Sequence, residues 1–318
     1  MKRVLATALV VTVSACGGEE GGPWSGAEDS ASETLVGTSA SLAQPSPTFI
    51  PKPTGPCPEF KDGTLTFQPA GVPARSVRIW MSDAAKTLDG PLVFYWHGTG
   101  SQPTEATTGI GTTQIEAIKA QGGIVAAPAH DPAAGTFPWF YVSSTSRDDD
   151  FRVADEILAC AIQKVGVNVS RIHSMGMSAG GLNTTHMSYR RSGYIASVAT
   201  YSGGRTSTIP TQDATNKFAA MIFHGGSSDQ VVINFQTVSQ NYYNDLKSKS
   251  QFAMICNHGR GALHPHGRAR RSGSSSRPTP SAPSRLPTRA DCRAPCRATA
   301  SDEPPGPHGL QVAAHSSP

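Results

Sequence analysis

Patterns of membrane-spanning and metal-binding proteins are missing from this sequence. The apolar run near the N-terminus, Val4 to Val13, is too short to cross a bilayer as a helix of the mature protein. No C-x-x-C pair and no histidine and cysteine cluster has the spacing of zinc ligands. We therefore expect no spanning helix there and no metal site, and nothing implies an organic cofactor.

A basic surface that would bind nucleic acid is also missing from the body of the chain. The net charge is +4, but nine Arg stand against only three acidic residues from Gly259 onward. That surplus of six leaves the rest of the chain near −2. Nucleic-acid binding is therefore not expected.

Several residue types are absent from the C-terminal part. Between Gly259 and Pro318 there is no Lys, Ile, Phe, Tyr, Trp, Asn or Met, while Arg, Pro, Ser, Ala and Gly dominate. One explanation is an Arg/Pro-rich disordered tail. The other is a frameshift in a GC-rich gene, because reading such a gene out of frame favours these same residues.

The N-terminus has the three parts of an export signal. Residues 1–3 give a basic start, Val4 to Val13 an apolar centre, and Ser14 to Cys16 a small-residue end. Val13 to Cys16 resembles a bacterial lipobox, which implies a lipid on Cys16 and attachment to a membrane surface. The alternative is an ordinary cleaved signal and a secreted protein.

The six cysteines fit an exported protein but do not fix its disulfides. Export would place the five cysteines after Cys16 where disulfides form. Three of them, Cys57, Cys160 and Cys256, lie in the central part of the chain, so one has no partner there. Their connectivity stays open at this point.

Composition divides the chain into a signal (1–16), a tether (17–56), a folded domain (57–258) and a tail (259–318). The tether is rich in Gly, Ser, Thr, Glu and Pro and has no apolar periodicity. In the domain, apolar or alternating runs of residues that suit strands are interspersed with segments whose apolar residues recur at helical spacing. Strands are expected at Thr64 to Phe67, Ser76 to Met81, Pro91 to Trp96, Gly123 to Ala127, Arg171 to Met175, Ala196 to Tyr201, Ala219 to Phe223 and Phe252 to Cys256. Helices are expected at Thr112 to Ala120, Asp149 to Lys164 and Asn234 to Lys247.

Several of the later strands are continuously apolar. Such strands are typical of a parallel sheet that is buried on both faces and wrapped by helices, so we predict an α/β fold. Ligands of such sheets bind at the carboxyl ends of the strands. The three motifs that follow all lie at expected strand ends.

The first motif surrounds Ser178. An apolar strand runs from Ile172 into this serine, and a helix-compatible stretch, Gly180 to Arg191, follows. Gly176 and Gly180 complete the G-x-S-x-G pattern of a nucleophile elbow, where the serine occupies a strained turn and small residues, here also Ala179, let strand and helix approach closely. Free N–H groups at the start of the helix favour a developing oxyanion.

The second motif is a glycine-rich loop, His97 to Gly100, directly after an expected strand. Its backbone N–H groups, together with that of Ala179, are placed to form an oxyanion hole. His97 precedes the serine and ends an early strand, so we interpret it as a structural part of the loop. The third motif carries Asp229, in a loop after a late strand some fifty residues past the serine. This acid is positioned to orient a histidine base, and the alternative is a solvated turn residue.

Together the motifs make the central part of the chain similar to the polyhydroxybutyrate depolymerase-like and feruloyl-esterase-like family of exported α/β-hydrolases. The matching segments are FYWHGTG, GIVAAPAHDP, IHSMGMSAGG, TYSGG and FHGGSSDQVV, spread between Cys57 and Cys256. The resemblance implies an α/β-hydrolase fold with Ser178 as nucleophile and Asp229 as triad acid. It also implies that Thr99 and Ala179 donate to the oxyanion hole.

The family places its histidine base in a loop after the last strand, as Cys-x-His-Gly-Gly-Gly-His-x-x-Pro. Here the match holds from Cys256 through Gly259 and then breaks, and Ala262 occupies the position of the histidine. The chain as written offers His264 or His266 instead, with His264 the candidate base, and His258 is the structural member of the motif.

Back-translation supports the frameshift explanation. Dropping one base at Arg260 permits His-Gly-Gly-Gly-His-Ser-Ile-Pro, the missing family motif. Further on, Ser272 to Arg277 read from the third codon base permit Trp-Gln-Phe-Phe-Gln, a plausible closing helix that needs another change of frame. Resequencing the gene decides between this explanation and a genuine tail.

We therefore predict an exported serine esterase that forms an acyl-enzyme on Ser178. Trp139 and Phe140 are candidates to line the acyl pocket, and core packing or a lid is the alternative. Another candidate function is a surface binding lipoprotein that keeps the hydrolase fold without turnover. The sequence does not choose among polyester, feruloylated or acetylated polysaccharide and small esters, and it gives no oligomeric state.

Overall fold

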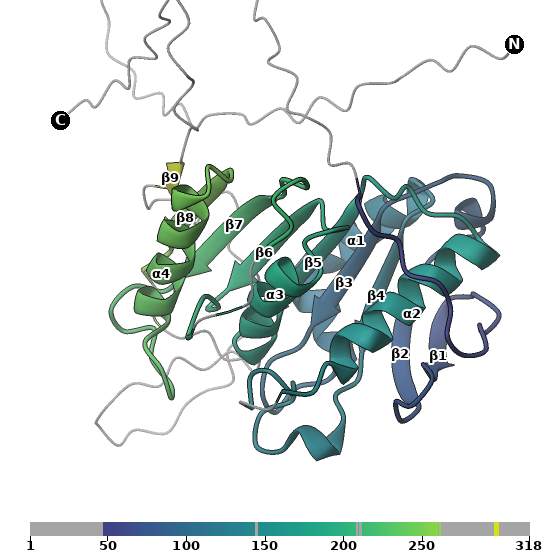
Figure 1. Ribbon diagram of the computed structural model, residues 1–318, viewed down its shortest axis with the longest axis horizontal. Coiled ribbons are helices and arrows are strands. Elements are labelled where there is room, and N and C mark those ends of the chain that lie inside the picture. The colour runs from purple at the N-terminus through teal and green to yellow at the C-terminus, as the bar shows by residue number, and fades with distance from the viewer. Residues whose placement is uncertain are drawn as a thin grey trace, which may run out of the picture. The chain divides into compact units, whose positions relative to one another are not determined.

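The computed structural model describes residues 47–143, 146–207, 209, 212–259 and 261, and the backbone of 296–298. Strands and helices alternate through it, as the sequence predicts (Figure 1). The strands are β1 (Gly63–Phe67), β2 (Arg75–Trp80), β3 (Leu92–Trp96), β4 (Ile124–Pro128), β5 (Ile172–Met177), β6 (Ser197–Tyr201), β7 (Ala219–His224), β8 (Ala253–Asn257) and β9 (Cys296–Ala298). The α-helices are α1 (Thr112–Ala120), α2 (Asp149–Lys164), α3 (Ala179–Arg190) and α4 (Phe235–Ser248).

All nine strands form one sheet in the order β1-β2-β4-β3-β5-β6-β7-β8-β9. The strands from β4 through β8 in this order are parallel, whereas β2 is antiparallel to both β1 and β4. At the other edge β9 pairs antiparallel with β8, with Cys256 opposite Cys296. The prediction of a mostly parallel sheet wrapped by helices is confirmed. None of the helices in the described residues is long and apolar enough to cross a membrane.

Helices cover the two faces of the sheet unequally. In Figure 1, α2, α3 and α4 lie in front of the sheet and α1 lies behind it. The front helices pack on the main core, which includes Phe94, Trp96 and Ile222. Behind the sheet, α1 contributes Ile115 to a smaller core that also holds Val93. Both cores place apolar helix faces on alternate residues of the same strands, because successive strand side chains point to opposite faces.

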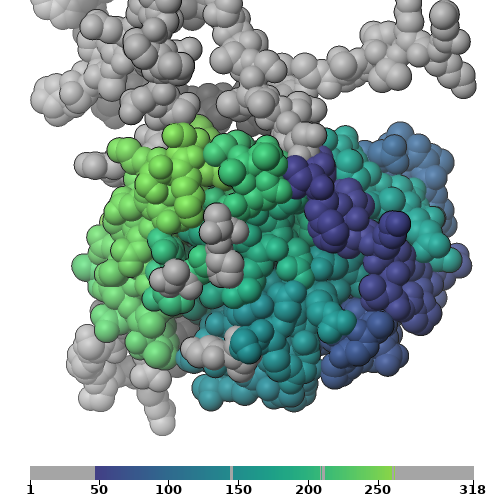
Figure 2. Space-filling model, in the orientation of Figure 1, coloured from purple at the N-terminus to yellow at the C-terminus, as the bar shows by residue number. Residues whose placement is uncertain are grey.

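The segment before the first strand packs on the domain. The Thr48 N–H donates to the carbonyl of Gly193 at 2.8 Å. Glu156 on α2 accepts three bonds, from the N–H and hydroxyl of Thr54 and from the N–H of Gly55, each at 2.8 Å. Figure 2 shows this segment, in purple, lying along the surface of the domain. Residues 47–56 fall in the predicted tether, so its described end belongs structurally to the domain.

A disulfide ties the same region to α2. Cys57 and Cys160 are bonded, with 5.3 Å between their Cα atoms and 103 residues between them along the chain. This bond settles a pairing that the sequence left open. Exported proteins commonly use such bonds because the cross-link restricts the unfolded chain.

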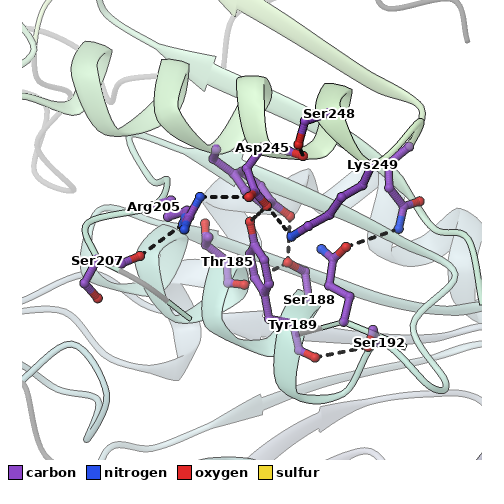
Figure 3. A network of polar contacts seen from close by, with 12 residues as sticks. Thr185, Ser188, Tyr189, Ser192, Arg205, Ser207, Asp245, Ser248 and Lys249 are labelled. Carbon is purple, nitrogen blue, oxygen red and sulfur yellow. Dashed lines mark hydrogen bonds and ion pairs between the residues drawn. The ribbon is translucent and has the colours of Figure 1, made fainter. Parts of the chain in front are cut away.

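A polar network joins α3 to α4 (Figure 3). Asp245 accepts bonds from Arg205 at 2.8 Å, from Lys249 at 2.6 Å and from the Tyr189 hydroxyl. Burial on its own raises the pKa of the Asp245 carboxyl, but the bonds from Lys249 and Tyr189 outweigh it and lower that pKa below its usual value. The ionised carboxylate therefore holds α4 against the helix that begins after Ser178.

Candidate active site

Ser178 occupies the turn between β5 and α3 with a backbone conformation of φ 56° and ψ −121°. A non-glycine residue with positive φ is strained and is held there by its surroundings. The Ser178 N–H donates to the carbonyl of Tyr201 at 2.8 Å, and its own carbonyl accepts from the N–H of Leu182 at 2.9 Å. The predicted order of strand, serine and helix is confirmed.

Three glycines around Ser178 have no room for a side chain. A Cβ on Gly176 would lie 2.3 Å from the Gly180 carbonyl oxygen, and one on Gly180 would lie 1.8 Å from the oxygen of Trp96. A Cβ on Gly181 would lie 2.8 Å from the oxygen of Tyr201. The first two glycines belong to the predicted elbow, whereas no local pattern marks Gly181, because its neighbour Tyr201 belongs to a strand further along the chain.

The loop after β3 lies beside Ser178. A Cβ placed on Gly98 would be 3.5 Å from the Cβ of Ser178. Thr99 is exposed at the tip of this loop. Ala179 is the first residue of α3, so its N–H has no helical acceptor four residues earlier. Both candidate oxyanion donors therefore belong to segments that border the serine.

Glu105, which the sequence analysis did not single out, holds this loop. Its buried carboxylate accepts from the N–H of Gly98 at 3.1 Å and from the hydroxyl of Tyr95 at 3.0 Å. Burial, followed by the charge of Glu105, raises the pKa of Tyr95 well above its usual value, so this hydroxyl keeps its proton. No local sequence signal marks Glu105, because its partners are a strand residue and a loop backbone.

His97 is fully buried at the base of the same loop. Its Nδ1 lies 2.8 Å from the carbonyl oxygen of Gly98, and its Nε2 lies 3.3 Å from Nδ1 of His130. Burial lowers the pKa of His97 to about 4, so the ring is neutral near pH 7. These contacts agree with a structural role for His97 rather than with a catalytic base.

Asp229 lies in the loop after β7 and is fully buried. Its Oδ2 accepts from the Ser202 hydroxyl at 2.9 Å and from the N–H of Gly225 at 2.7 Å. Within the described part of the chain, its Oδ1 has no hydrogen-bond partner. A buried carboxylate oxygen normally has a donor, so this atom marks a position where a donor group fits.

Ser202 is a second residue that sequence reasoning missed. It follows β6 with φ 46°, and its N–H donates to the carbonyl of Phe223. This strained backbone directs the hydroxyl to Asp229. The segment TYSGG contributed to the family resemblance, but nothing in its local pattern shows that its serine supports an acid 27 residues later.

The loop after β8 lies against the loop of Asp229. The His258 N–H donates to the carbonyl of His224, and the Gly261 N–H donates to the carbonyl of Gly225, both at 2.9 Å. A Cβ on Gly225 would lie only 2.0 Å from the Gly261 oxygen. The chain thus reaches the neighbourhood of the acid one residue before position 262.

Several predicted residues lie outside the described residues. They are Cys16, Arg260, Ala262, His264 and His266. Among the described histidines of this region, His224 accepts at Nδ1 from the N–H of Gly226 at 3.1 Å, and no bond joins it to Asp229. Burial lowers the pKa of His224, against the opposing effect of the Asp229 charge.

Trp139 and Phe140, the candidates for an acyl pocket, are both fully buried. The Trp139 ring packs edge-on against Trp96 with centroids 5.0 Å apart, and its Nε1 donates to the carbonyl of His97 at 3.0 Å. The N–H of Phe140 donates to Asp150 at 2.8 Å. This burial agrees with the alternative of core packing, and a role of the two rings in an acyl pocket stays a prediction.

A cavity of about 440 Å³ does open next to the glycine-rich loop. Its lining is mostly polar and consists of Gly100, Ser101, Gln102, Thr104, Glu105, Thr107 and Thr108. Elsewhere among the described residues, Cys57, Glu156 and Cys160 are the one group with the spacing of metal ligands. The two sulfurs of that group are bonded to each other, so they are not available as thiolates.

Comparison with known proteins supports the fold and goes no further. Neither a family model nor a curated protein matches the chain. The native structure of sOPH is 17% identical, covers 67% of this chain and 84% of its own, and has a TM-score of 0.54. A serine-to-alanine variant of pOPH in complex with pNPB is 15% identical, covers 65% and 83%, and has a TM-score of 0.51. A ferulic acid esterase from Anaeromyces mucronatus, in complex with ferulic acid, is 14% identical, with coverage of 61% and 81% and a TM-score of 0.42.

This chain has the α/β-hydrolase fold. The strand order, the antiparallel β2 and the turn at Ser178 all agree with that fold, as do the solved structures that match it. The fold predicted from the resemblance is therefore confirmed.

Proposed function

We propose that this protein is a serine carboxylic-ester hydrolase that acts through an acyl-enzyme. The observation that carries the proposal is the strained backbone of Ser178 at the start of α3, beside the Gly98 loop. In a nucleophile elbow this arrangement presents the serine oxygen beside backbone N–H groups of the loop and of the helix start. The buried Asp229, with one unpaired oxygen in the described residues, supports the proposal from the loop after β7, two strands along the sheet from β5.

The reaction follows from these positions. A histidine base takes the proton of the Ser178 hydroxyl while the oxygen attacks the ester carbonyl carbon, and the N–H groups of Thr99 and Ala179 bind the oxyanion that forms. The C–O bond to the alcohol then breaks, and the base returns the proton to the leaving alcohol. Water repeats the sequence on the acyl-enzyme and releases the acid. Asp229 orients the histidine and stabilises its charged form.

The base belongs to the loop after β8. Gly261 contacts the Asp229 loop, which supports a base supplied by the sequence directly after it. In the chain as written we assign the base to His264. If the gene is frameshifted at Arg260, the base is the histidine that replaces Ala262.

We further propose that the protein acts outside the cytoplasm, either secreted or anchored by a lipid on Cys16. The export signal and the Cys57–Cys160 disulfide support this location. As substrates we propose extracellular esters, with polyester, feruloyl or acetyl polysaccharide esters and small esters as the candidates. The complex of a pOPH variant with pNPB makes a nitrophenyl ester a suitable first probe.

The test is hydrolysis of a short-chain p-nitrophenyl ester by four chains: the chain as written, its Ser178→Ala and His264→Ala variants, and a chain with Arg260→Gly and Ala262→His. Activity that is lost with Ser178→Ala supports the proposal. Loss with His264→Ala assigns the base to His264. A gain on the order of 10³-fold or more in the double variant assigns it to position 262.

A second candidate function is a binding lipoprotein that keeps this fold without turnover. The observation that favours it is the sequence after Gly259, where Ala262 occupies the position of the family's histidine. It predicts that all four chains are folded and inactive, including the double variant. That result would overturn the esterase proposal.

A further inference from the structure

The polar cavity beside the glycine-rich loop begins next to the candidate nucleophile. A Cβ on Gly98 would lie 3.5 Å from the Cβ of Ser178 and 3.6 Å from Oε2 of Glu105, which lines the cavity. This loop follows β3, whereas the candidate base follows β8, and the two strands lie on opposite sides of β5 (Figure 1). The cavity is therefore on the side of Ser178 that faces away from the base.

The cavity has the size and the chemistry of a site for a small polar group. Its volume of about 440 Å³ falls in the range of small-molecule pockets, roughly 300 to 1,000 Å³. Hydroxyl groups in its wall come from Ser101, Thr104 and Thr108. An amide comes from Gln102. These groups both donate and accept hydrogen bonds, so they suit a ligand that carries hydroxyl groups of its own.

The charge of the wall disfavours an anionic ligand. The wall includes the buried carboxylate of Glu105. In the described part of the chain, no Lys or Arg lines the cavity. A carboxylate or phosphate placed there would be repelled by Glu105 and would have no cation beside it. The ligand that fits is therefore neutral.

The wall is held in place by contacts within the protein. Glu105 ends a short turn of 3₁₀-helix and accepts from the N–H of Gly98 at 3.1 Å and from the hydroxyl of Tyr95 at 3.0 Å. The segment that follows, Thr107–Gly111, is one turn of π-helix, and a Cβ on its Gly109 would lie 1.9 Å from the Tyr95 hydroxyl oxygen. The glycine thus lets Tyr95 reach Glu105. A wall that is fixed in advance costs a ligand less ordering when it binds.

The direction of the reaction decides which half of an ester lies near this cavity. The base must protonate the leaving alcohol, so the alcohol oxygen faces the loop after β8. An ester whose carbonyl oxygen is bound by the N–H groups of Thr99 and Ala179 then directs its acyl group away from that loop. The cavity wall continues from Thr99 through Gly100 and Ser101. The acyl group is therefore the half that reaches this wall.

We propose that this cavity is an acyl subsite that selects esters of neutral, hydroxylated acids over esters of apolar or anionic acids. The proposal rests on the proposed esterase function and narrows its substrate class. Thr104 and Thr108 bind a hydroxyl group of the acyl chain while the oxyanion donors bind the carbonyl oxygen.

The test uses pairs of esters that differ in one group. Ethyl 3-hydroxypropanoate and ethyl butanoate have the same shape, with a hydroxyl in place of a methyl group at the end of the acyl chain. 2-Hydroxyethyl butanoate and propyl butanoate make the same exchange in the alcohol. Each kcat/KM is divided by the rate of hydrolysis of that ester by hydroxide. In whichever chain hydrolyses the nitrophenyl ester, we expect about a three- to tenfold preference for the hydroxylated acid and none for the hydroxylated alcohol, since one hydrogen bond discriminates by this much.

The double variant Thr104→Val, Thr108→Val locates the preference, because it keeps the shape of both side chains and removes their hydroxyl groups. It should abolish the preference. Thr113→Val, at an exposed position of α1 outside the cavity, is the matched control and should leave the preference unchanged. In an active chain, a preference that is absent, that survives the double variant or that occurs in the alcohol pair overturns the proposal. Faster hydrolysis of monoethyl succinate than of ethyl butanoate also overturns it.

Binding to a Ser178→Ala chain separates this proposal from the proposed function. That variant has no nucleophile, so saturation transfer from the protein to each ester, measured by NMR, reports binding without turnover. We expect ethyl 3-hydroxypropanoate to bind more tightly than ethyl butanoate and to lose this advantage when Thr104→Val and Thr108→Val are added. If the parent chain hydrolyses no ester but this binding preference is present, the esterase proposal fails and the subsite is supported. Equal binding of the two esters overturns the subsite, whether or not the parent chain is active.

Discussion

At the scale of single residues, the acid of the site depends on a hydroxyl from another strand. Asp229 is buried, and two of its bonds come from Ser202 and from the N–H of Gly225. The oxygen they hold is Oδ2, which leaves Oδ1 without a hydrogen-bond partner in the described residues. Ser202 is therefore a positioning residue that fixes which oxygen is offered to a base.

Removing the Ser202 hydroxyl should weaken catalysis without weakening substrate binding. In whichever chain hydrolyses the nitrophenyl ester, we expect Ser202→Ala to lower kcat about 10- to 100-fold with little change in KM, because the acid loses orientation but keeps its charge. Asp229→Asn should cost far more, on the order of 10⁴-fold. Steady-state kinetics measure both.

The control for Ser202→Ala is Ser248→Ala on α4, whose hydroxyl bonds only to the carbonyl of Asp245. Its kcat should equal that of the parent chain. A Ser202→Ala variant that keeps full kcat would contradict the positioning role.

At the scale of elements, α3 is held closer to the sheet than side chains normally permit. A Cβ on Gly180 would lie 1.8 Å from the oxygen of Trp96, which is a backbone atom and cannot rotate away. This contact brings the start of the helix to Ser178, so the same glycine serves both stability and the geometry of the oxyanion site.

We expect Gly180→Ala to lower the free energy of unfolding by about 2 kcal/mol or more, because the new methyl group must displace backbone. Urea denaturation measures the effect. Asn241→Ala, at an exposed position of α4, is the matched control and should change stability by less than about 0.5 kcal/mol. A Gly180→Ala protein as stable as its parent would show that α3 can shift without cost.

Local sequence patterns predicted the elements well because periodicity and glycine spacing are local properties. The order of strand, serine and helix at Ser178 and the bounds of α2 are examples. The roles of Ser202 and Glu105 could not be predicted from the sequence, because they depend on contacts between strands and loops that are distant along the chain. Trp139 was ambiguous because an aromatic residue suits a pocket wall and a core equally well, and its burial could not be predicted from the local sequence.

At the scale of the whole molecule, buried histidines link stability to pH. His97 and His186 each have a pKa of about 4, lowered by burial from 6.5. Between those two values the unfolded chain binds protons that the folded chain does not. Their contribution to stability is therefore complete above about pH 6.5 and is lost as the pH falls toward 4.

A single substitution isolates one of these histidines. His186 stacks on Tyr141 with centroids 5.5 Å apart, and His186→Phe keeps an aromatic ring there without a titrating group. Between pH 6.5 and 4.5 we expect the stability of the variant to fall less steeply, by up to about 1.4 kcal/mol per pH unit. Urea titrations at several pH values measure the slopes, and equal slopes for variant and parent would contradict the assignment.

The Cys57–Cys160 bond joins residues that are 103 positions apart, so its loss should increase the conformational entropy of the unfolded chain. We expect the double variant Cys57→Ser, Cys160→Ser to be less stable by about 2 to 5 kcal/mol. Thermal unfolding with and without a reductant measures the effect. Because Cys256 is also disulfide-bonded, the reductant should destabilise the double variant less than the parent chain, and equal effects on the two chains would contradict a structural role for the Cys57–Cys160 bond.

The position of that disulfide also sets how the domain bears mechanical load. A force that pulls on the N-terminal end of the chain acts first on the hydrogen bonds of Thr48 and Thr54. It then acts on the disulfide between Cys57 and Cys160. Strand β1, at the sheet edge, begins only at Gly63, beyond this bond. Force applied from that end is therefore transmitted through the disulfide to α2. While the disulfide is intact, this force does not separate β1 from the sheet.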